Sequence, residues 1–143
     1  MTATWIKPLP VITPASRPFF DGLREHVFRV PRCQSCGHYN WSPYPACRSC
    51  LSIDQEWVEV SGRGSLYTFS EIHVGPLAFT QDGPYIWAFA KLAEGPRPLI
   101  VMGNLTGVEP GEVEVDMPIK IGYHDVPGHD LALYHFERDT DAR

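Results

Sequence analysis

The chain has 143 residues, enough for one domain of ordinary size or two very small ones. Hydrophobic residues make up 43% and charged residues 20%, a globular composition, and the 14 prolines and 12 glycines favour short strands over long helices. The formal net charge of -5 and the lack of any basic run weigh against a protein that binds by neutralising nucleic-acid phosphates.

Residues 1–18 are predicted to form an extended arm. Pro8, Pro10, Pro14 and Pro18 each fix their own φ and push the preceding residue toward extended geometry. The arm also carries more apolar surface than a solvated tail, so we expect it to lie against its own body or against another chain. Its apolar residues are Trp5, Ile6, Leu9, Val11 and Ile12.

Neither an export signal nor a membrane span is predicted. The N-terminal residues lack a basic segment followed by an apolar one, and no stretch approaches the roughly 18–20 apolar residues that cross a bilayer. We therefore expect a soluble, cytoplasmic protein with no membrane partner.

A helix is predicted after the arm, with Ser16 as its cap and Pro18 tolerated in its first turn. We expect about three turns, ending before Pro31, so that arm and helix together occupy residues 1–30. The apolar face of this helix consists of Phe19, Phe20, Leu23 and Val27.

The four cysteines of the chain form two C-x-x-C pairs, Cys33 with Cys36 and Cys47 with Cys50. Two disulfides would suit a secreted protein, whereas a reducing compartment favours thiolate ligation. A thioredoxin-like redox motif is disfavoured, because it needs only one such pair and a βαβ setting, and neither condition is met here. We therefore predict a zinc ribbon over residues 31–54 with structural zinc, because four thiolates leave no open position for water. Iron in the same site stays an alternative.

Residues 55–138 are predicted to form a small barrel or sandwich of short strands separated by turn signals. A mainly β fold with an OB-type, five-stranded antiparallel barrel is the closest match in strand length and number. The loop 75–84 carries Leu77 and Phe79 where a plain hairpin would be polar. This loop is expected to be a contact surface or a plug of the barrel. The segment from Asp139 onward is expected to fray.

A catalytic set is not evident from the sequence. A second metal site or an acid/base pair could in principle be assembled from His124, Asp125, His129, Asp130 and His135. A polar loop between two strands is the favoured interpretation. Arg63, between two glycines, could offer a cation to a phosphate, although a solvated turn residue is the plainer interpretation.

Several segments together resemble the OB-fold, zinc-ribbon family known as domain of unknown function 35, which is found with thiolase-superfamily enzymes. They are PFFDGL (18–23), RCQSCG (32–37), CRSC (47–50), EWVEVSGRGSLYTF (56–69), PY (84–85), LAEG (92–95) and IKIGY (119–123). The chain departs from this family before the third cysteine. Family members usually have an aromatic residue, two prolines and an arginine there, whereas this chain has Trp41, Ser42, Pro43 and Tyr44.

The resemblance implies a non-catalytic accessory subunit in a hetero-oligomer. Its partner would be a thiolase-like or lipid-transfer-protein-like subunit that supplies the nucleophile and base, with acyl-CoA at the shared interface. The candidate residues for contact with the partner or the acyl-CoA channel are Trp5, Tyr44, Arg63, Leu77, Phe79 and Tyr85.

Two alternatives remain. The first is a single-stranded nucleic-acid-binding module that uses aromatic platforms, although the basic groove is missing. Those aromatics are Tyr67, Phe69, Tyr85 and Trp87. The second is a small hydrolase that uses the histidine-rich segment 124–135.

Overall fold

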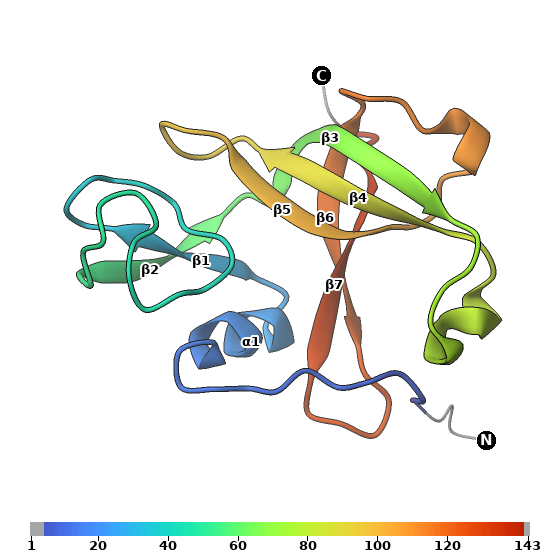
Figure 1. Ribbon diagram of the computed structural model, residues 1–143, viewed down its shortest axis with the longest axis horizontal. Coiled ribbons are helices and arrows are strands. Elements are labelled where there is room, and N and C mark those ends of the chain that lie inside the picture. Colours follow the sequence, from blue (N-terminus) through green and yellow to red (C-terminus); the bar gives the residue numbers. More distant parts are fainter. Residues whose placement is uncertain (1–4, 142–143) are drawn as a thin grey trace.

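Strands dominate the structure, a computed structural model that describes residues 5–141. A two-stranded antiparallel sheet, formed by β1 (Phe28–Cys33) and β2 (Gln55–Val60), lies beside a closed five-stranded barrel (Figure 1). The mainly β fold class with an OB-type barrel is therefore confirmed. The barrel order is β3-β4-β5-β7-β6, with β3 (Arg63–Ile72), β4 (Tyr85–Leu92), β5 (Leu99–Leu105), β6 (Pro118–Asp125) and β7 (Ala132–Arg138).

The sequence predicts a purely antiparallel barrel, and in this detail the prediction is wrong. β5 and β7 run parallel through the pair Leu105 and Phe136, and the Thr106 N–H donates to the Phe136 carbonyl over 2.8 Å. The reason is parity, because a ring with an odd number of strands cannot alternate direction at every contact. The contact between β5 and β7 is where this barrel places its parallel pair.

The segment Gln55–Val60, predicted to be part of the barrel, instead belongs to the two-stranded sheet with β1. It pairs with β1 along its full length, from Cys33 opposite Gln55 to Phe28 opposite Val60. The barrel therefore begins at β3. The cysteine-bearing loops lie between β1 and β2 in the sequence, so each end of this segment is joined to a strand of the two-stranded sheet.

The helix α1 (Arg17–Arg24) is shorter than predicted, with about two turns instead of about three. It ends because His26 adopts φ 58°, and the N–H groups of His26 and Val27 bond to the Leu23 and Gly22 carbonyls. This pattern is a Schellman motif. The Ser16 hydroxyl does not cap the helix but accepts a hydrogen bond from the Thr13 N–H at 3.0 Å.

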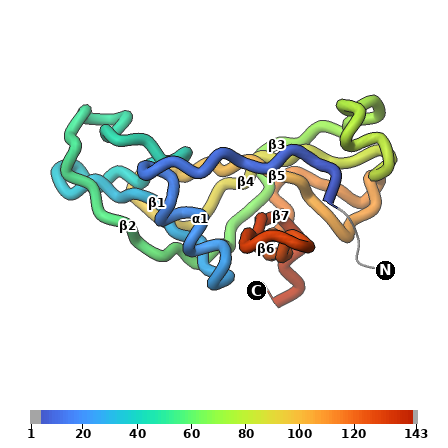
Figure 2. Tube along the Cα trace, turned by 90° about the horizontal axis from the view of Figure 1, so that it is seen from below, coloured from blue at the N-terminus to red at the C-terminus, as the bar shows by residue number. Residues whose placement is uncertain are grey.

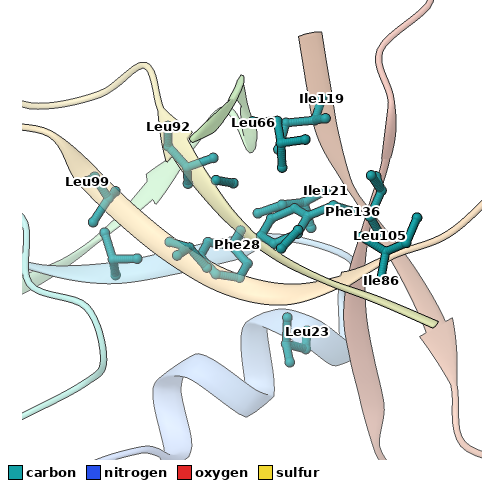
Figure 3. Packing of buried hydrophobic residues seen from close by; sticks show 14 of the residues in the cluster. Leu23, Phe28, Leu66, Ile86, Leu92, Leu99, Leu105, Ile119, Ile121 and Phe136 are labelled. Carbon is teal, nitrogen blue, oxygen red and sulfur yellow. The ribbon is translucent and has the colours of Figure 1, made fainter. Parts of the chain in front are cut away.

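The core joins α1 and β1 to the barrel. Phe28 is buried with its ring centroid 5.3 Å from Phe19 of α1 and 5.1 Å from Tyr134 of β7. Figure 3 shows Phe28 and Leu23 next to the barrel side chains that fill the centre. Because burying a side chain of this size contributes about 1.5–3 kcal/mol, these contacts hold the two parts together. The barrel core includes Leu66, Ala88, Ala90, Leu92, Val101, Ile119 and Phe136.

The arm lies along its own body in the described residues. It runs from α1 toward the short 3-10 helix η1 (Leu77–Asp82) (Figure 2). There the Lys7 ammonium is 2.6 Å from an Asp82 carboxylate oxygen, and the Trp5 ring lies 6.1 Å from that of His124, centroid to centroid. A second 3-10 turn, η2 (Pro110–Glu112), precedes β6.

The end of the barrel is more ordered than the sequence predicted. Asp139, expected to begin a frayed tail, is buried, and its N–H donates to the Pro118 carbonyl over 3.0 Å. Among the described residues, none of the helices has the length and apolar character that crossing a bilayer requires.

Candidate metal centre and candidate binding surface

Each C-x-x-C pair forms the same tight turn. In the first, at the end of β1, the Gly37 N–H donates to the Cys33 carbonyl over 2.9 Å. In the second, the Leu51 N–H donates to the Cys47 carbonyl over 2.9 Å. Both turns direct the two sulfur atoms of a pair toward one point, as metal-binding knuckles require.

The sulfur positions fit one tetrahedral ion. The Cys33 and Cys50 sulfurs are 3.5 Å apart, those of Cys36 and Cys47 are 3.7 Å apart, and all four lie within 4.8 Å of one another. Zinc–sulfur bonds of about 2.3 Å place tetrahedral ligands about 3.8 Å apart, close to these separations. Four protein thiolates fill the coordination sphere, so the zinc is structural.

The thiols differ in pKa, and therefore in how readily they ionise to the thiolate form that binds a metal. The N–H groups of Cys36 and Ser35 lower the pKa of the Cys33 thiol against the effect of burial. Burial opposes ionisation of Cys47 as well, but N–H groups of Cys50 and Ser49 lower its pKa to about 6. For Cys50 the Ser52 N–H favours the thiolate, yet the neighbouring sulfurs raise the pKa to about 12. The positive charge of a metal ion removes this repulsion.

Asn40 supports the metal site, although no sequence motif marks it. It is 0% exposed, donates to the Gln55 side chain over 2.7 Å and accepts from the Arg48 N–H at 3.0 Å. Gln55 donates in turn to the Tyr44 carbonyl over 2.9 Å. Asn40 thereby ties β2 to the second knuckle. No motif marked it, because a lone asparagine in a loop is read as a turn residue.

Three of the six residues proposed for partner or channel contact come together. Trp5 from the arm, Phe79 from η1 and Tyr85 from β4 line one cavity of about 760 Å³. Lys7 lies in the same wall with its ammonium 5.2 Å from the Phe79 ring centroid. The loop 75–84 therefore forms the side of a cavity and does not plug the barrel.

The other three residues lie apart from this cavity. Leu77 is 87% exposed at the start of η1, and Tyr44 is 59% exposed in the ribbon. The Arg63 guanidinium is 2.6 Å from a carboxylate oxygen of buried Asp139. This ion pair favours a structural role for Arg63 at the barrel end over the phosphate contact considered from the sequence.

The histidine-rich segment divides among separate contacts. His124 and His135 approach to 3.3 Å between their Nδ1 atoms, and His135 contacts Glu137. Burial lowers the pKa of His124, and the charges of His135 and Lys7 lower it further against the opposing effect of Asp125. The neighbouring acidic residues contact residues in and next to α1. Asp125 pairs with His26, and Asp130 pairs with Arg24. Within residues 5–141, the four cysteines are the one group of metal-ligand type found.

Fold and site together define a zinc ribbon joined to an OB-type barrel, and comparisons with known proteins agree. The family model for the ChsH2 rubredoxin-like zinc ribbon domain matches residues 20–53. The model for the ChsH2 C-terminal OB-fold domain matches residues 57–124.

Curated relatives and a solved structure narrow the class. A DUF35 domain-containing scaffold protein of Pyrococcus furiosus is 32% identical over 74% of this chain and 77% of its own length. The benzoylsuccinyl-CoA thiolase subunit BbsA of Geobacter metallireducens is 29% identical over 75% of this chain and 71% of its own. A chain of the structure titled Ltp2-ChsH2(DUF35) aldolase superposes with a TM-score of 0.77 and 28% identity, covering 91% of this chain and 98% of that one. The protein belongs to the DUF35 family.

Some relatives are much longer. The 3-oxo-4,17-pregnadiene-20-carboxyl-CoA hydratase alpha subunit of Mycobacterium tuberculosis is 33% identical over 85% of this chain but only 37% of its own length. The present chain thus spans little more than a third of that relative.

Proposed function

We propose that this protein is a non-catalytic accessory subunit of an acyl-CoA-processing enzyme. It binds a thiolase-like partner, of the thiolase or steroid side-chain aldolase type, and supports the cleavage or formation of a carbon–carbon bond in an acyl-CoA. The nucleophile and the base belong to the partner, and the acyl-CoA lies at the shared interface of a hetero-oligomer.

One observation carries the proposal. The chain covers almost the whole of the DUF35 chain in a structure titled an aldolase, and it does so at 28% identity with a TM-score of 0.77. A relative of similar length is named a thiolase subunit, which supports the same class of partner. The hydratase named for the longer relative is not part of the proposal, because this chain spans only 37% of that protein.

The chemistry of the site supports an accessory role. Four thiolates would fill the coordination sphere of a zinc ion held there and leave it no position at which to bind and polarise a substrate. The cavity beneath the arm offers aromatic surface from Trp5, Phe79 and Tyr85 and one cation, Lys7, which Asp82 already neutralises. Such a surface suits packing against a protein or an acyl chain better than binding the CoA phosphates.

Affinity capture tests the proposal. Tagged full-length protein is incubated with nuclease-treated lysate of the source organism, and proteins recovered in stoichiometric amount are identified by mass spectrometry. An unrelated OB-fold protein serves as the control bait. We expect a thiolase-superfamily protein on this bait and not on the control. Recovery of single-stranded nucleic acid from untreated lysate, without such a protein, would instead support the nucleic-acid-binding alternative.

A further inference from the structure

The two zinc knuckles use the same backbone turn with different residues at one position. The residue after the second cysteine has a positive φ in both, 75° at Gly37 and 65° at Leu51. In both, its N–H donates to the carbonyl of the first cysteine of the pair over 2.9 Å. Glycine adopts this left-handed conformation freely, whereas a leucine is strained in it because its Cβ approaches the backbone.

The turn holds Leu51 in this conformation through the bond from its N–H to the Cys47 carbonyl, but packing of its side chain within the described chain does not offset the strain. Its side chain is 78% exposed, so it gains little from packing, and Ile53 two residues later is 83% exposed. We call these two residues the knuckle tip. Scattered exposed apolar residues are ordinary, but a strained and exposed one points to a contact outside the chain.

The knuckle tip is rigidly held. The residue between its two members, Ser52, accepts a hydrogen bond from the Cys47 N–H at 2.8 Å and pairs with the Ser35 hydroxyl at 3.0 Å. The ribbon loops project at the end of the molecule farthest from η1 (Figure 1). Because the backbone is already held, the binding of these side chains in a complementary pocket requires ordering of the side chains alone.

We propose that the knuckle tip is an apolar anchor that inserts into a pocket on the thiolase-like subunit. This inference rests on the proposed function and adds the surface through which the two proteins meet. A protein pocket fits better than an anionic lipid surface, because Asp54 adjoins the tip and the net charge of the chain is -5. A few side chains that fill desolvated pockets carry most of the affinity of such interfaces.

The substitution Leu51→Gly separates contact from folding. It removes the side chain and also the backbone strain, so the melting temperature should not fall. Calorimetric titration against the purified thiolase-superfamily subunit obtained by capture should show Kd raised about tenfold or more. Ile53→Ser, outside the strained position, should weaken binding in the same direction. Val115→Ser is the matched control, because Val115 is 56% exposed on the loop before β6 and should leave Kd unchanged.

Each outcome decides the question. Unchanged Kd for both tip variants, with the wild type binding, would overturn the anchor and leave the proposed function standing. A fall in melting temperature on Leu51→Gly would show that the leucine serves the fold of the ribbon. Loss of self-association in the tip variants, with Kd for the subunit unchanged, would assign the tip to a second copy of this chain. Failure of the wild type to bind the subunit would remove the proposed function and this inference with it.

Discussion

At the residue scale, the ribbon depends on contacts between groups that lie far apart in the sequence. Cys33 and Cys50 approach to 3.5 Å across 17 residues, and the buried side chain of Asn40 reaches both β2 and the second knuckle. Without the metal, the four thiols do not all ionise, because neighbouring sulfurs raise the pKa of Cys50 while the pKa values of Cys33 and Cys47 are lowered. The free energy of metal binding is therefore part of the free energy of folding.

Replacement of one ligand tests this coupling. We expect Cys47→Ser to lose its bound zinc and to unfold the ribbon, since structural zinc contributes on the order of 10 kcal/mol in comparable modules. Circular dichroism and metal analysis measure both effects. Ser49→Ala, in the same knuckle, removes only an exposed hydrogen bond from Arg97 and should keep its zinc. A folded, monodisperse Cys47→Ser protein would contradict the structural role.

Residue types predicted the metal site well and the other contacts poorly. Two C-x-x-C pairs identify a tetrathiolate site because the short spacing itself determines the geometry. Arg63 shows the limit, because its partner Asp139 lies 76 residues away and no local pattern connects them. Trp5 and Phe79 likewise meet at one cavity only because the arm folds back across the barrel.

At the element scale, the barrel closes where β3 lies between two neighbours. Gly64 is opposite Leu92 of β4 and also opposite Ile119 of β6. A Cβ atom at Gly64 would lie 2.1 Å from the Lys91 carbonyl oxygen, which the β3–β4 ladder holds in place. A side chain cannot be accommodated there unless the two strands move apart.

Gly64→Ala should therefore lower the free energy of unfolding by about 3 kcal/mol, at the upper end of the cost of overpacking. Urea denaturation monitored by tryptophan fluorescence gives this value. Gly111→Ala is the control, because an added Cβ there meets no atom within 4 Å. Equal stability of the two variants would show that the strands yield at Gly64.

The elements also show which boundaries a sequence can predict. The alternation in QEWVEV suits either sheet, so pairing with β1 instead of the barrel could not be derived from it. The helix was expected to continue toward Pro31, but the left-handed residue His26 ends it earlier, and a histidine in that conformation carries no clear signal. Strand number and barrel type were predictable, because turn signals divide the chain at regular intervals.

At the scale of the whole molecule, the surfaces open to a partner lie toward opposite ends. The ribbon loops, which carry the knuckle tip, lie at one end of the molecule and η1 lies at the other (Figure 1), where Phe79 and Asp82 line the cavity under the arm. The buried contacts of Phe28 with Phe19 and Tyr134 hold ribbon and barrel together. A rigid body with contacts at both ends is suited to orient a partner, which agrees with an accessory role.

In the proposed function, this chain supports the chemistry of another subunit without performing it. The most direct measurement is the rate of acyl-CoA carbon–carbon bond cleavage or formation by the purified thiolase-superfamily subunit, with and without this chain at equimolar concentration. We predict no turnover for this chain alone, little for the subunit alone, and full activity for the complex. Turnover by this chain alone, or a rate for the subunit that the chain does not change, would rule out an accessory role.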